Sequence, residues 1–248
     1  MTTQSGRGSD PKAPATFADS KDTIRTGLER NADAANYVSW LAELCGPFVG
    51  STCLEIGAGH GDLAALLSDG RRYEASDLSD ECLARLEARF ATTPNVTVRA
   101  VDVATFSEKE AFDSILLVNV LEHIADDRGA VARLRNGLTT GGRLIVYVPA
   151  FELLYSRFDR DLGHHRRYRK GPLRTLLEDE GFKVLEARYV NMLAAFGWFL
   201  YCRVLGRDAS DQITVSACDR FVVPVLRRVE RWVPPPFGIS VLCVGEKL

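Results

Sequence analysis

The chain has 248 residues, of which 46% are hydrophobic and 26% are charged, and its formal net charge at pH 7 is −2. This composition is typical of a globular protein and excludes a disordered, collagen-like or disulfide-framework chain. The near balance of charge gives no overall attraction to nucleic acid. We therefore expect a single globular domain with a large hydrophobic core.

The cysteines and the apolar segments indicate the cellular compartment of the protein. Six cysteines occur without a Cys-x-x-Cys pair, which predicts reduced thiols in a cytoplasmic protein. The first residues are polar and lack the apolar centre of a secretory signal. Residues 192–202 form the longest nearly uncharged apolar stretch, which is too short to cross a bilayer. Residues 1–18 predict a disordered lead-in, followed by one domain over residues 19–248.

The first two thirds of the chain alternate between strand and helix patterns after a helical segment at residues 24–48. Such alternation favours a parallel sheet with helices on both faces. The predicted strands are 52–56, 73–76, 96–101, 112–119 and 144–148, and the predicted helices are 62–68, 80–91 and 126–138. Ser79 or Asp80 is expected to cap the second of these helices.

The alternation of strand and helix patterns ends after Pro149. Residues 150–171 are rich in Arg, His, Tyr and Asp and predict an inserted lid. The elements expected after the lid are a helix from Pro172 to Gly181, a strand at 182–189, an apolar helix at 192–205, a last helix near 215–232 and a final strand at 239–244. The predicted fold is Rossmann-like α/β with seven mostly parallel strands, an N-terminal helical cap, a lid after the fifth strand and a helical acceptor-side region at 191–235.

A Gly-rich turn follows the first predicted strand in the segment Leu54-Glu55-Ile56-Gly57-Ala58-Gly59-His60-Gly61. Glycines there permit a tight turn and the close approach of a ligand. Asp77 ends the second strand, where a carboxylate can bind both hydroxyls of a ribose. Asp102 ends the third strand, next to the place of an adenine amino group. Because parallel strands end at one edge of a sheet, these groups predict a nucleotide-derived ligand.

Two nucleotide-derived ligands fit a Gly-rich turn with acidic residues at the strand ends. Three details favour S-adenosylmethionine over NAD. A dinucleotide fingerprint needs Gly-x-Gly-x-x-Gly, but here the third glycine comes one position early and Asp62 follows it. Glu55 suits a cationic amino-acid group better than a pyrophosphate. The Tyr-x-x-x-Lys pair of many dehydrogenases is missing at Tyr168, since Pro172 stands four residues later.

With Asn119-Val120-Leu121-Glu122-His123 added, these motifs make residues 24–248 resemble a class I S-adenosylmethionine-dependent methyltransferase. The closer resemblance is to a small-molecule branch with a ubiquinone-biosynthesis-like core. The resemblance implies S-adenosylmethionine as cofactor, S-adenosylhomocysteine as product and no metal. The cofactor-binding residues that it implies are Arg30, Tyr37, Glu55, Gly57, Ala58, Gly59, Asp77, Leu78, Asp102, Val103 and Asn119.

Methyl transfer from a sulfonium is an in-line displacement, so the protein mainly aligns the reactants and excludes water. A hydroxyl or amine acceptor can also need a base, and histidine is the usual one near neutral pH. His123 is the first candidate because it follows the fourth strand, although it is also suited to a packing role. His164 and Tyr168 are further candidate catalytic residues. The candidate substrate-binding residues are Tyr155, His165, Arg166, Arg167 and Asn191.

Two features of the second half bear on the acceptor. The basic lid predicts binding of a phosphate or carboxylate; the alternative is a solvated lid in which Asp159 and Asp161 pair internally. The aromatic helix at 192–205 is expected to pack in the core, or else to wall a pocket for an apolar acceptor or contact a membrane surface. We thus expect a small-molecule acceptor, anionic or lipid-like, that is methylated on O, N or C.

Nucleic acid is a disfavoured acceptor. Methyltransferases that act on a flipped base resemble one another in an Asn/Asp-Pro-Pro-aromatic string after the fourth strand, and here that position reads Asn119-Val120-Leu121-Glu122. A protein that binds S-adenosylmethionine as a sensor without catalysis remains an alternative, because the motifs bind the cofactor and none of them requires turnover. The oligomeric state is open.

Overall fold

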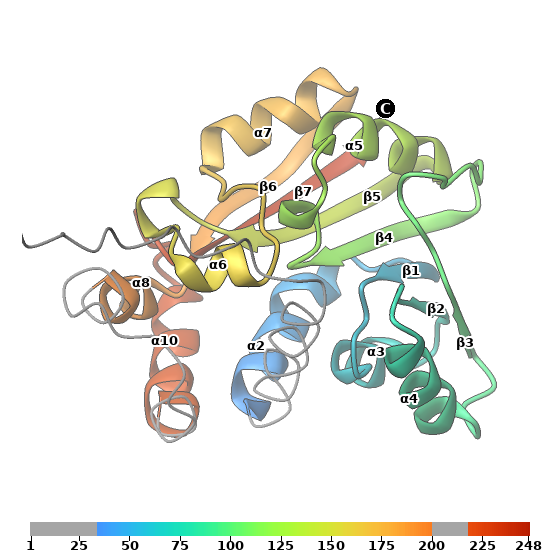
Figure 1. Cartoon of the computed structure of the whole chain (residues 1–248), viewed down its shortest axis with the longest axis horizontal. Helices are drawn as coiled ribbons and strands as arrows, with labels where there is room; N and C mark the ends of the chain where they lie inside the picture. Colours follow the sequence, from blue (N-terminus) through green and yellow to red (C-terminus); the bar gives the residue numbers. More distant parts are fainter. Residues whose placement is uncertain (1–33, 200–217) are drawn as a thin grey trace, which may run out of the picture.

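The computed structural model describes residues 34–199 and 218–248. These residues form a seven-stranded sheet in the order β3-β2-β1-β4-β5-β7-β6, in which β7 alone runs antiparallel to its neighbours (Figure 1). The strands are β1 (Thr52–Ile56), β2 (Arg72–Ser76), β3 (Val96–Arg99), β4 (Phe112–Val118), β5 (Leu138–Pro149), β6 (Phe182–Val190) and β7 (Ser240–Lys247). The predicted mostly parallel α/β fold is confirmed.

Helices cover both faces of this sheet. On one face lie α5 (Asp127–Gly137) and α7 (Lys170–Asp179); on the other lie α2 (Ala35–Cys45), α3 (Asp62–Leu67) and α4 (Asp80–Phe90) (Figure 1). The remaining helices are α6 (Arg157–Asp161), α8 (Met192–Trp198) and α10 (Val223–Glu230), with short turns η1 (Gly46–Phe48), η2 (Leu121–His123), η3 (Glu152–Leu154) and η5 (Cys218–Val222). In the described residues, none of these helices has the length and apolar character needed to cross a membrane.

A hydrophobic core lies on each face of the sheet, between the strands and the helices that cover them. Along β5, Leu144 and Val146 belong to the core under α5 and α7, whereas Ile145 and Tyr147 belong to the core under α2 and α3. All four side chains are fully buried. This double burial explains why the central strands read as continuous apolar runs instead of alternating ones.

Several predicted boundaries differ from the observed ones. The fifth strand begins at Leu138 and not at residue 144, because Leu138 already pairs with Phe112 before a bulge separates that pair from Ser114 and Arg143. The third strand ends at Arg99, two residues before its predicted end. The helix α7 begins at Lys170, so Pro172 is its third residue, where a backbone N–H has no intrahelical partner in any case.

Other predictions fall partly outside the described residues. These are the lead-in at 1–18, the start of the first predicted helix before residue 34, the end of the apolar helix after residue 199 and the loop around 206–212. The predicted last helix appears as η5 followed by α10, from residue 218 onward.

Candidate active site

A pocket of about 140 Å³ opens at the carboxyl ends of β1 and β4. Its walls come from the end of β1 with Glu55, from the Gly-rich turn at Gly57 to His60, from Asn119 after β4 and from α2 through Tyr37. Three segments far apart in sequence therefore bring six predicted cofactor-binding residues together: Tyr37, Glu55, Gly57, Ala58, Gly59 and Asn119. This is the edge at which open α/β sheets bind their ligands.

The Gly-rich turn needs glycine for two separate reasons. Gly57, Gly59 and Gly61 have φ angles of 73°, 56° and 78°, a left-handed region that side chains with a Cβ disfavour. A Cβ on Gly57 would also lie 2.5 Å from Cγ2 of Val120. The backbone therefore passes close to the segment after β4, where Asn119 also has a positive φ of 54°.

Glu55 is the buried acid of the pocket. It is 3% exposed, and the Tyr73 hydroxyl donates a hydrogen bond of 2.8 Å to its Oε2. Burial raises the pKa of Glu55 to about 7, although the bond from Tyr73 opposes this. A cation that enters the pocket would stabilise the ionised carboxylate.

Asp77 and its neighbours form the next part of the same edge. The Asp77 carboxylate accepts hydrogen bonds from Gly59 N at 3.0 Å and from Ser79 N at 2.9 Å, so it lies against the Gly-rich turn. The Leu78 side chain is 66% exposed and offers an apolar surface. Asp102 accepts a bond of 2.8 Å from Ala104 N, and Val103 is buried. Their roles toward a cofactor stay predictions.

Arg30 lies outside the described residues. Tyr37, the other predicted residue of the N-terminal helix, lines the pocket, and its hydroxyl lies 3.0 Å from that of Tyr147. Burial raises the pKa of Tyr37 to about 12, and the charge of Glu122 adds to the increase. Glu122 lies three residues after Asn119, which lines the same pocket.

The lid is held by a buried ion pair. The Arg167 guanidinium donates to both Asp159 carboxylate oxygens, at 2.7 and 3.0 Å, and lies over the Trp198 ring at 5.3 Å from its centroid. Although burial alone would raise the pKa of Asp159, hydrogen bonds from His164 and Arg167 lower it to about 2. Arg167 thus pairs with Asp159 inside the lid, and its predicted part in binding an anionic acceptor stays a prediction.

Arg166 is also paired within the chain. It contacts Asp127 at 2.6 Å and donates to the carbonyl oxygen of Ala125 at 2.6 Å. The Tyr168 hydroxyl donates to the same Asp127 carboxylate at 2.9 Å. Burial and Asp127 raise the pKa of Tyr168 well above its ordinary value, so this hydroxyl stays protonated and is a poor base.

The other predicted substrate residues also have local partners. Tyr155 donates to the carbonyl oxygen of His164 at 2.8 Å, and the His165 side chain is exposed. Asn191 is buried and caps α8 by accepting a bond of 3.2 Å from Ala194 N. Asn191 N donates to Glu230 at 3.0 Å. Its position before a helix was a sequence signal for capping and not for substrate contact.

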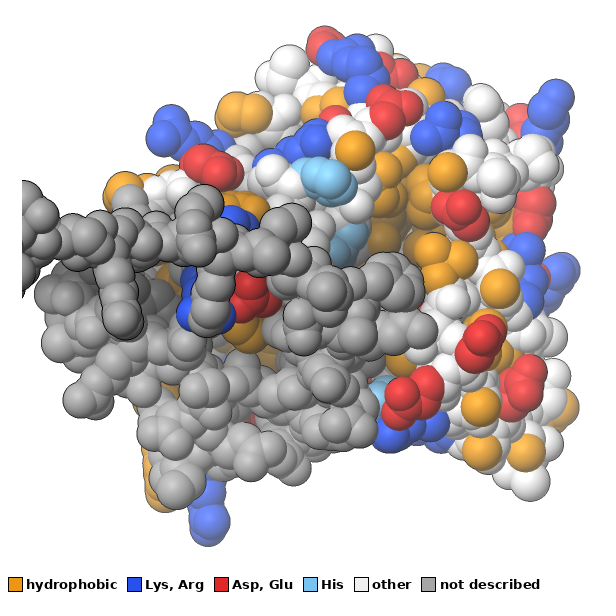
Figure 2. Space-filling model, in the orientation of Figure 1, with side chains coloured by type: hydrophobic (Ala, Val, Ile, Leu, Met, Phe, Trp, Pro, Cys, Tyr) orange, Lys and Arg blue, Asp and Glu red, His pale blue; other side chains and the backbone are white. Residues whose placement is uncertain are grey.

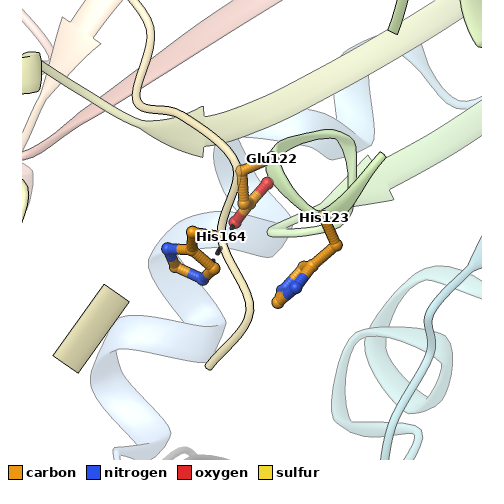
Figure 3. Close-up of side chains that lie close together, drawn as sticks. All are labelled: Glu122, His123 and His164. Atoms are coloured by element: carbon orange, nitrogen blue, oxygen red, sulfur yellow. Dashed lines mark ion pairs between the residues drawn. The ribbon is translucent and has the colours of Figure 1, made fainter. Parts of the chain in front are cut away.

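Glu122 and His123 in η2 lie close to His164 of the lid (Figure 3). The two histidine rings are 4.6 Å apart between centroids and meet edge to face. Burial raises the pKa of Glu122 to about 8. Desolvation by surrounding atoms and the nearby His164 lower the pKa of His123 to about 4, although part of its side chain is open to solvent. His123 is therefore neutral at pH 7.

Sequence reasoning named His123 and His164 but gave Glu122 no role. Its signal was an acidic residue directly beside a histidine at the end of a central strand, an edge where side chains face ligands. The approach of His164 to Glu122 joins the lid to the segment after β4. Because these segments are far apart along the chain, their contact has no local signature.

The geometry defines a class: a Rossmann-like α/β protein with one reversed strand and a Gly-rich pocket at the carboxyl ends of β1 and β4. The family described as "Methyltransferase domain" matches residues 54–144. The match covers less than half of the chain; it shows that residues 54–144 are similar to a methyltransferase domain, and the Rossmann-like fold agrees with this likeness.

Proteins named as methyltransferases are also similar to this chain in sequence or in fold. An uncharacterised methyltransferase of Mycobacterium tuberculosis is 35% identical over 100 residues, which are 40% of this chain and 51% of that protein. The chain thus spans about half the length of that relative. A Haloferax volcanii protein from a complex of the Trm112 methyltransferase activator with a candidate methyltransferase is similar in fold, with a TM-score of 0.65 at 16% identity over 93% of this chain and 97% of that one. Haemonchus contortus phosphoethanolamine N-methyltransferase 2, solved with S-adenosylmethionine, has a TM-score of 0.58 at 20% identity over 84% of this chain and 52% of that one.

Proposed function

We propose that this chain transfers the methyl group of S-adenosylmethionine to a small-molecule acceptor. The observation that carries the proposal is the pocket that places Glu55, the Gly-rich turn and Asn119 at one sheet edge, with Asp77 against the turn. In the reaction, a lone pair of the acceptor forms the new bond to the methyl carbon. The sulfur–carbon bond breaks, its electron pair goes to sulfur, and S-adenosylhomocysteine leaves.

Different pocket residues bind different parts of the cofactor. Glu55 holds the amino group, because a buried carboxylate favours a cation. Asp77 binds the ribose hydroxyls, and the exposed Leu78 side chain packs on the adenine ring. Asp102 and Val103 face the adenine amino group. Tyr37 and Asn119 border the methionine portion.

The acceptor enters from the side of the lid (150–171) and of the helical region (191–235). Three large apolar side chains of the α8 segment are exposed: Leu193, Phe196 and Phe199. The Trp198 indole donates to the carbonyl oxygen of Leu154 at 3.1 Å and so joins this segment to the lid. These exposed groups favour an acceptor with an apolar, lipid-like body.

An anionic head on the acceptor has less support, because Arg166 and Arg167 already pair with Asp127 and Asp159. The proton of a hydroxyl acceptor leaves on the side of His123, which follows Asn119 closely in the chain and is neutral at pH 7. The free thiols Cys45, Cys53, Cys82, Cys218 and Cys243 support a reducing, cytoplasmic setting.

Transfer of a labelled methyl group into an extract of the source cell tests the proposal, with products separated into organic-soluble, water-soluble and macromolecular fractions. Label in the organic-soluble fraction is the expected result. Label only in water-soluble products would contradict the lipid-like body, and label only in macromolecules would contradict the small-molecule class. Tight binding of S-adenosylhomocysteine without any transfer would favour the non-catalytic sensor. Binding of NADH in preference to S-adenosylhomocysteine would overturn the cofactor assignment.

A further inference from the structure

Glu122, His123 and His164, called here the Glu122 cluster, come from two separate segments. Glu122 and His123 lie in η2 after β4, and His164 follows α6 in the lid. One nitrogen of each histidine and one carboxylate oxygen of Glu122 lie within 4.8 Å of one another. Figure 3 shows the three side chains converging on one small space.

The Glu122 carboxylate is the unexplained member of this cluster. Its side chain is completely buried, and neither oxygen has a hydrogen-bond partner in the part of the chain that the structure describes. Among those residues, Nε2 of His164 lies 3.9 Å from Glu122 Oε1, which is too far for a hydrogen bond, and Arg167 acts on the carboxylate only through its charge. Buried carboxylates are normally paired or bound to a metal, because an uncompensated one is costly.

The surroundings of His164 orient one ring nitrogen toward Glu122. Its Nδ1 lies 2.9 Å from Asp159 Oδ1, so Nε2 remains for the side of Glu122. Asp159 is itself fixed by the two bonds from Arg167 and one from Ser156 N at 2.8 Å. Histidines that bind metals usually donate their other N–H to a carboxylate in this way.

We propose that the Glu122 cluster binds one divalent transition-metal cation of the zinc type, through one carboxylate oxygen and two imidazole nitrogens. Three protein ligands with an open fourth position are the usual catalytic arrangement of such cations. Zinc-bound nitrogen and oxygen atoms lie about 2.0–2.2 Å from the metal, so the three side chains close slightly around the ion. The exposed side of His123 provides the entry path, and Figure 2 shows histidine side chains at the surface of this face.

The cation would assist the proposed methyl transfer, and this part of the inference rests on that proposed function. Glu122 follows Asn119 of the pocket wall by three residues, and we place the open position on the side of that pocket. A hydroxyl acceptor bound there would lose its proton to water more easily, and its oxygen would then take the methyl group. In this arrangement His123 is a ligand and not a general base.

Metal binding can be measured without methyl transfer. The full chain is stripped with a chelator, exchanged into chelator-free buffer and titrated with zinc chloride by calorimetry. We expect one Zn²⁺ per chain in the wild type, and affinity that is weaker by about tenfold or more in Glu122→Gln and His123→Ala. His165→Ala is the matched control, because it removes an exposed neighbouring histidine; it should bind zinc as the wild type does.

Cobalt provides a second signature. The wild type loaded with Co²⁺ should show the visible bands of a four-coordinate site, and Glu122→Gln should lose them while its thermal melting remains cooperative. Absence of saturable zinc binding in the wild type would overturn the proposal. Equal zinc affinity in the wild type and Glu122→Gln would also overturn it, because the metal would then be held elsewhere, for example by thiols. Neither result depends on S-adenosylmethionine, so failure here is distinguishable from failure of the proposed function.

Discussion

The cofactor pocket and the lid are built in opposite ways. The pocket depends on backbone: three glycines with positive φ let the turn after β1 approach Val120 and Asn119. The lid depends on side chains: Asp159, Arg167 and His164 form one buried polar network. The pocket leaves space for a ligand, whereas the charged groups of the lid pair with one another.

The difference teaches how to interpret charged residues near a site. Arginines in a lid look like anion-binding groups until their partners are known. Arg167 is 9% exposed and bidentate to Asp159, so its charge is already compensated. Glu122, by contrast, is buried without a hydrogen-bond partner among the described residues. In this molecule a buried polar group without a hydrogen-bond partner, and not the number of charges, points to a candidate ligand site.

The strongest test of the comparison is Arg167→Met, which removes the cation of the lid. The buried Asp159 is then left with only His164 and Ser156 as partners. Breaking a buried pair in this way costs about 3–5 kcal/mol. For a chain of this size we expect the melting temperature to fall by roughly 6–20 °C. Differential scanning calorimetry measures it.

Arg166→Met is the matched control for that variant, because the pair with Asp127 is partly exposed. Its cost should stay within about 1 kcal/mol. If Arg167→Met melted like the wild type but lost methyl transfer, Arg167 would bind the acceptor and the internal pairing would be incidental.

Asp77→Ala should produce the largest effect on the pocket side. It removes the carboxylate that would hold two ribose hydroxyls, and each such charged hydrogen bond contributes about 1.5–3 kcal/mol. Affinity for S-adenosylhomocysteine should fall by at least about 100-fold, measured by calorimetry. Asp69→Ala, an exposed aspartate at the turn after α3, should bind normally. Unchanged affinity in Asp77→Ala would contradict our placement of the ribose.

Local signals predicted most of the fold. The strand β1 has its predicted bounds, and Ser79 caps α4 as expected, because capping and strand patterns depend on a few adjacent residues. The start of β5 could not be found this way. Gly141 and Gly142 predict a turn, yet Leu138 pairs with Phe112 across the sheet, a contact with no local signature.

The same rule decides which features of the site could be predicted from the sequence. Glu55 and Gly57 were predicted from the Gly-rich segment after the first strand, and Asn119 from the family resemblance. The structure brings all three to one pocket. The partners of Arg167 and Asn191 could not be predicted, since Asn191 meets Glu230 from a distant helix. A sequence motif shows which groups are present, but compensation of their charges is a property of the packed molecule.

Gly57→Ala should separate the two reasons for glycine in the pocket. The left-handed conformation costs about 1–2 kcal/mol for a residue with a Cβ, and the clash with Val120 adds to it. Gly70→Ala is the control, because Gly70 has a φ of 67° but no atom within 4 Å of the added Cβ. Both variants should melt earlier, and only Gly57→Ala should bind S-adenosylhomocysteine less tightly. Equal binding in the two would show that the turn tolerates displacement.

The smallest expected effect concerns pH and Glu55, whose pKa in the pocket is about 7 instead of 4.5. A raised carboxyl pKa means that the native state binds the proton more tightly, so the free energy of unfolding contributed by Glu55 falls as pH rises from about 4.5 through 7. Glu55→Gln should therefore gain stability relative to the wild type at pH 8. It should show no such gain at pH 4.

Cofactor binding should follow the opposite course. The amino group of S-adenosylhomocysteine favours ionised Glu55, so wild-type affinity should rise by about tenfold as pH increases from about 6 to 8. Glu55→Gln should bind with nearly constant affinity over that interval, in calorimetric titrations at matched ionic strength. The same rise in the variant would show that another group titrates, and that the buried acid of the pocket does not hold the amino group.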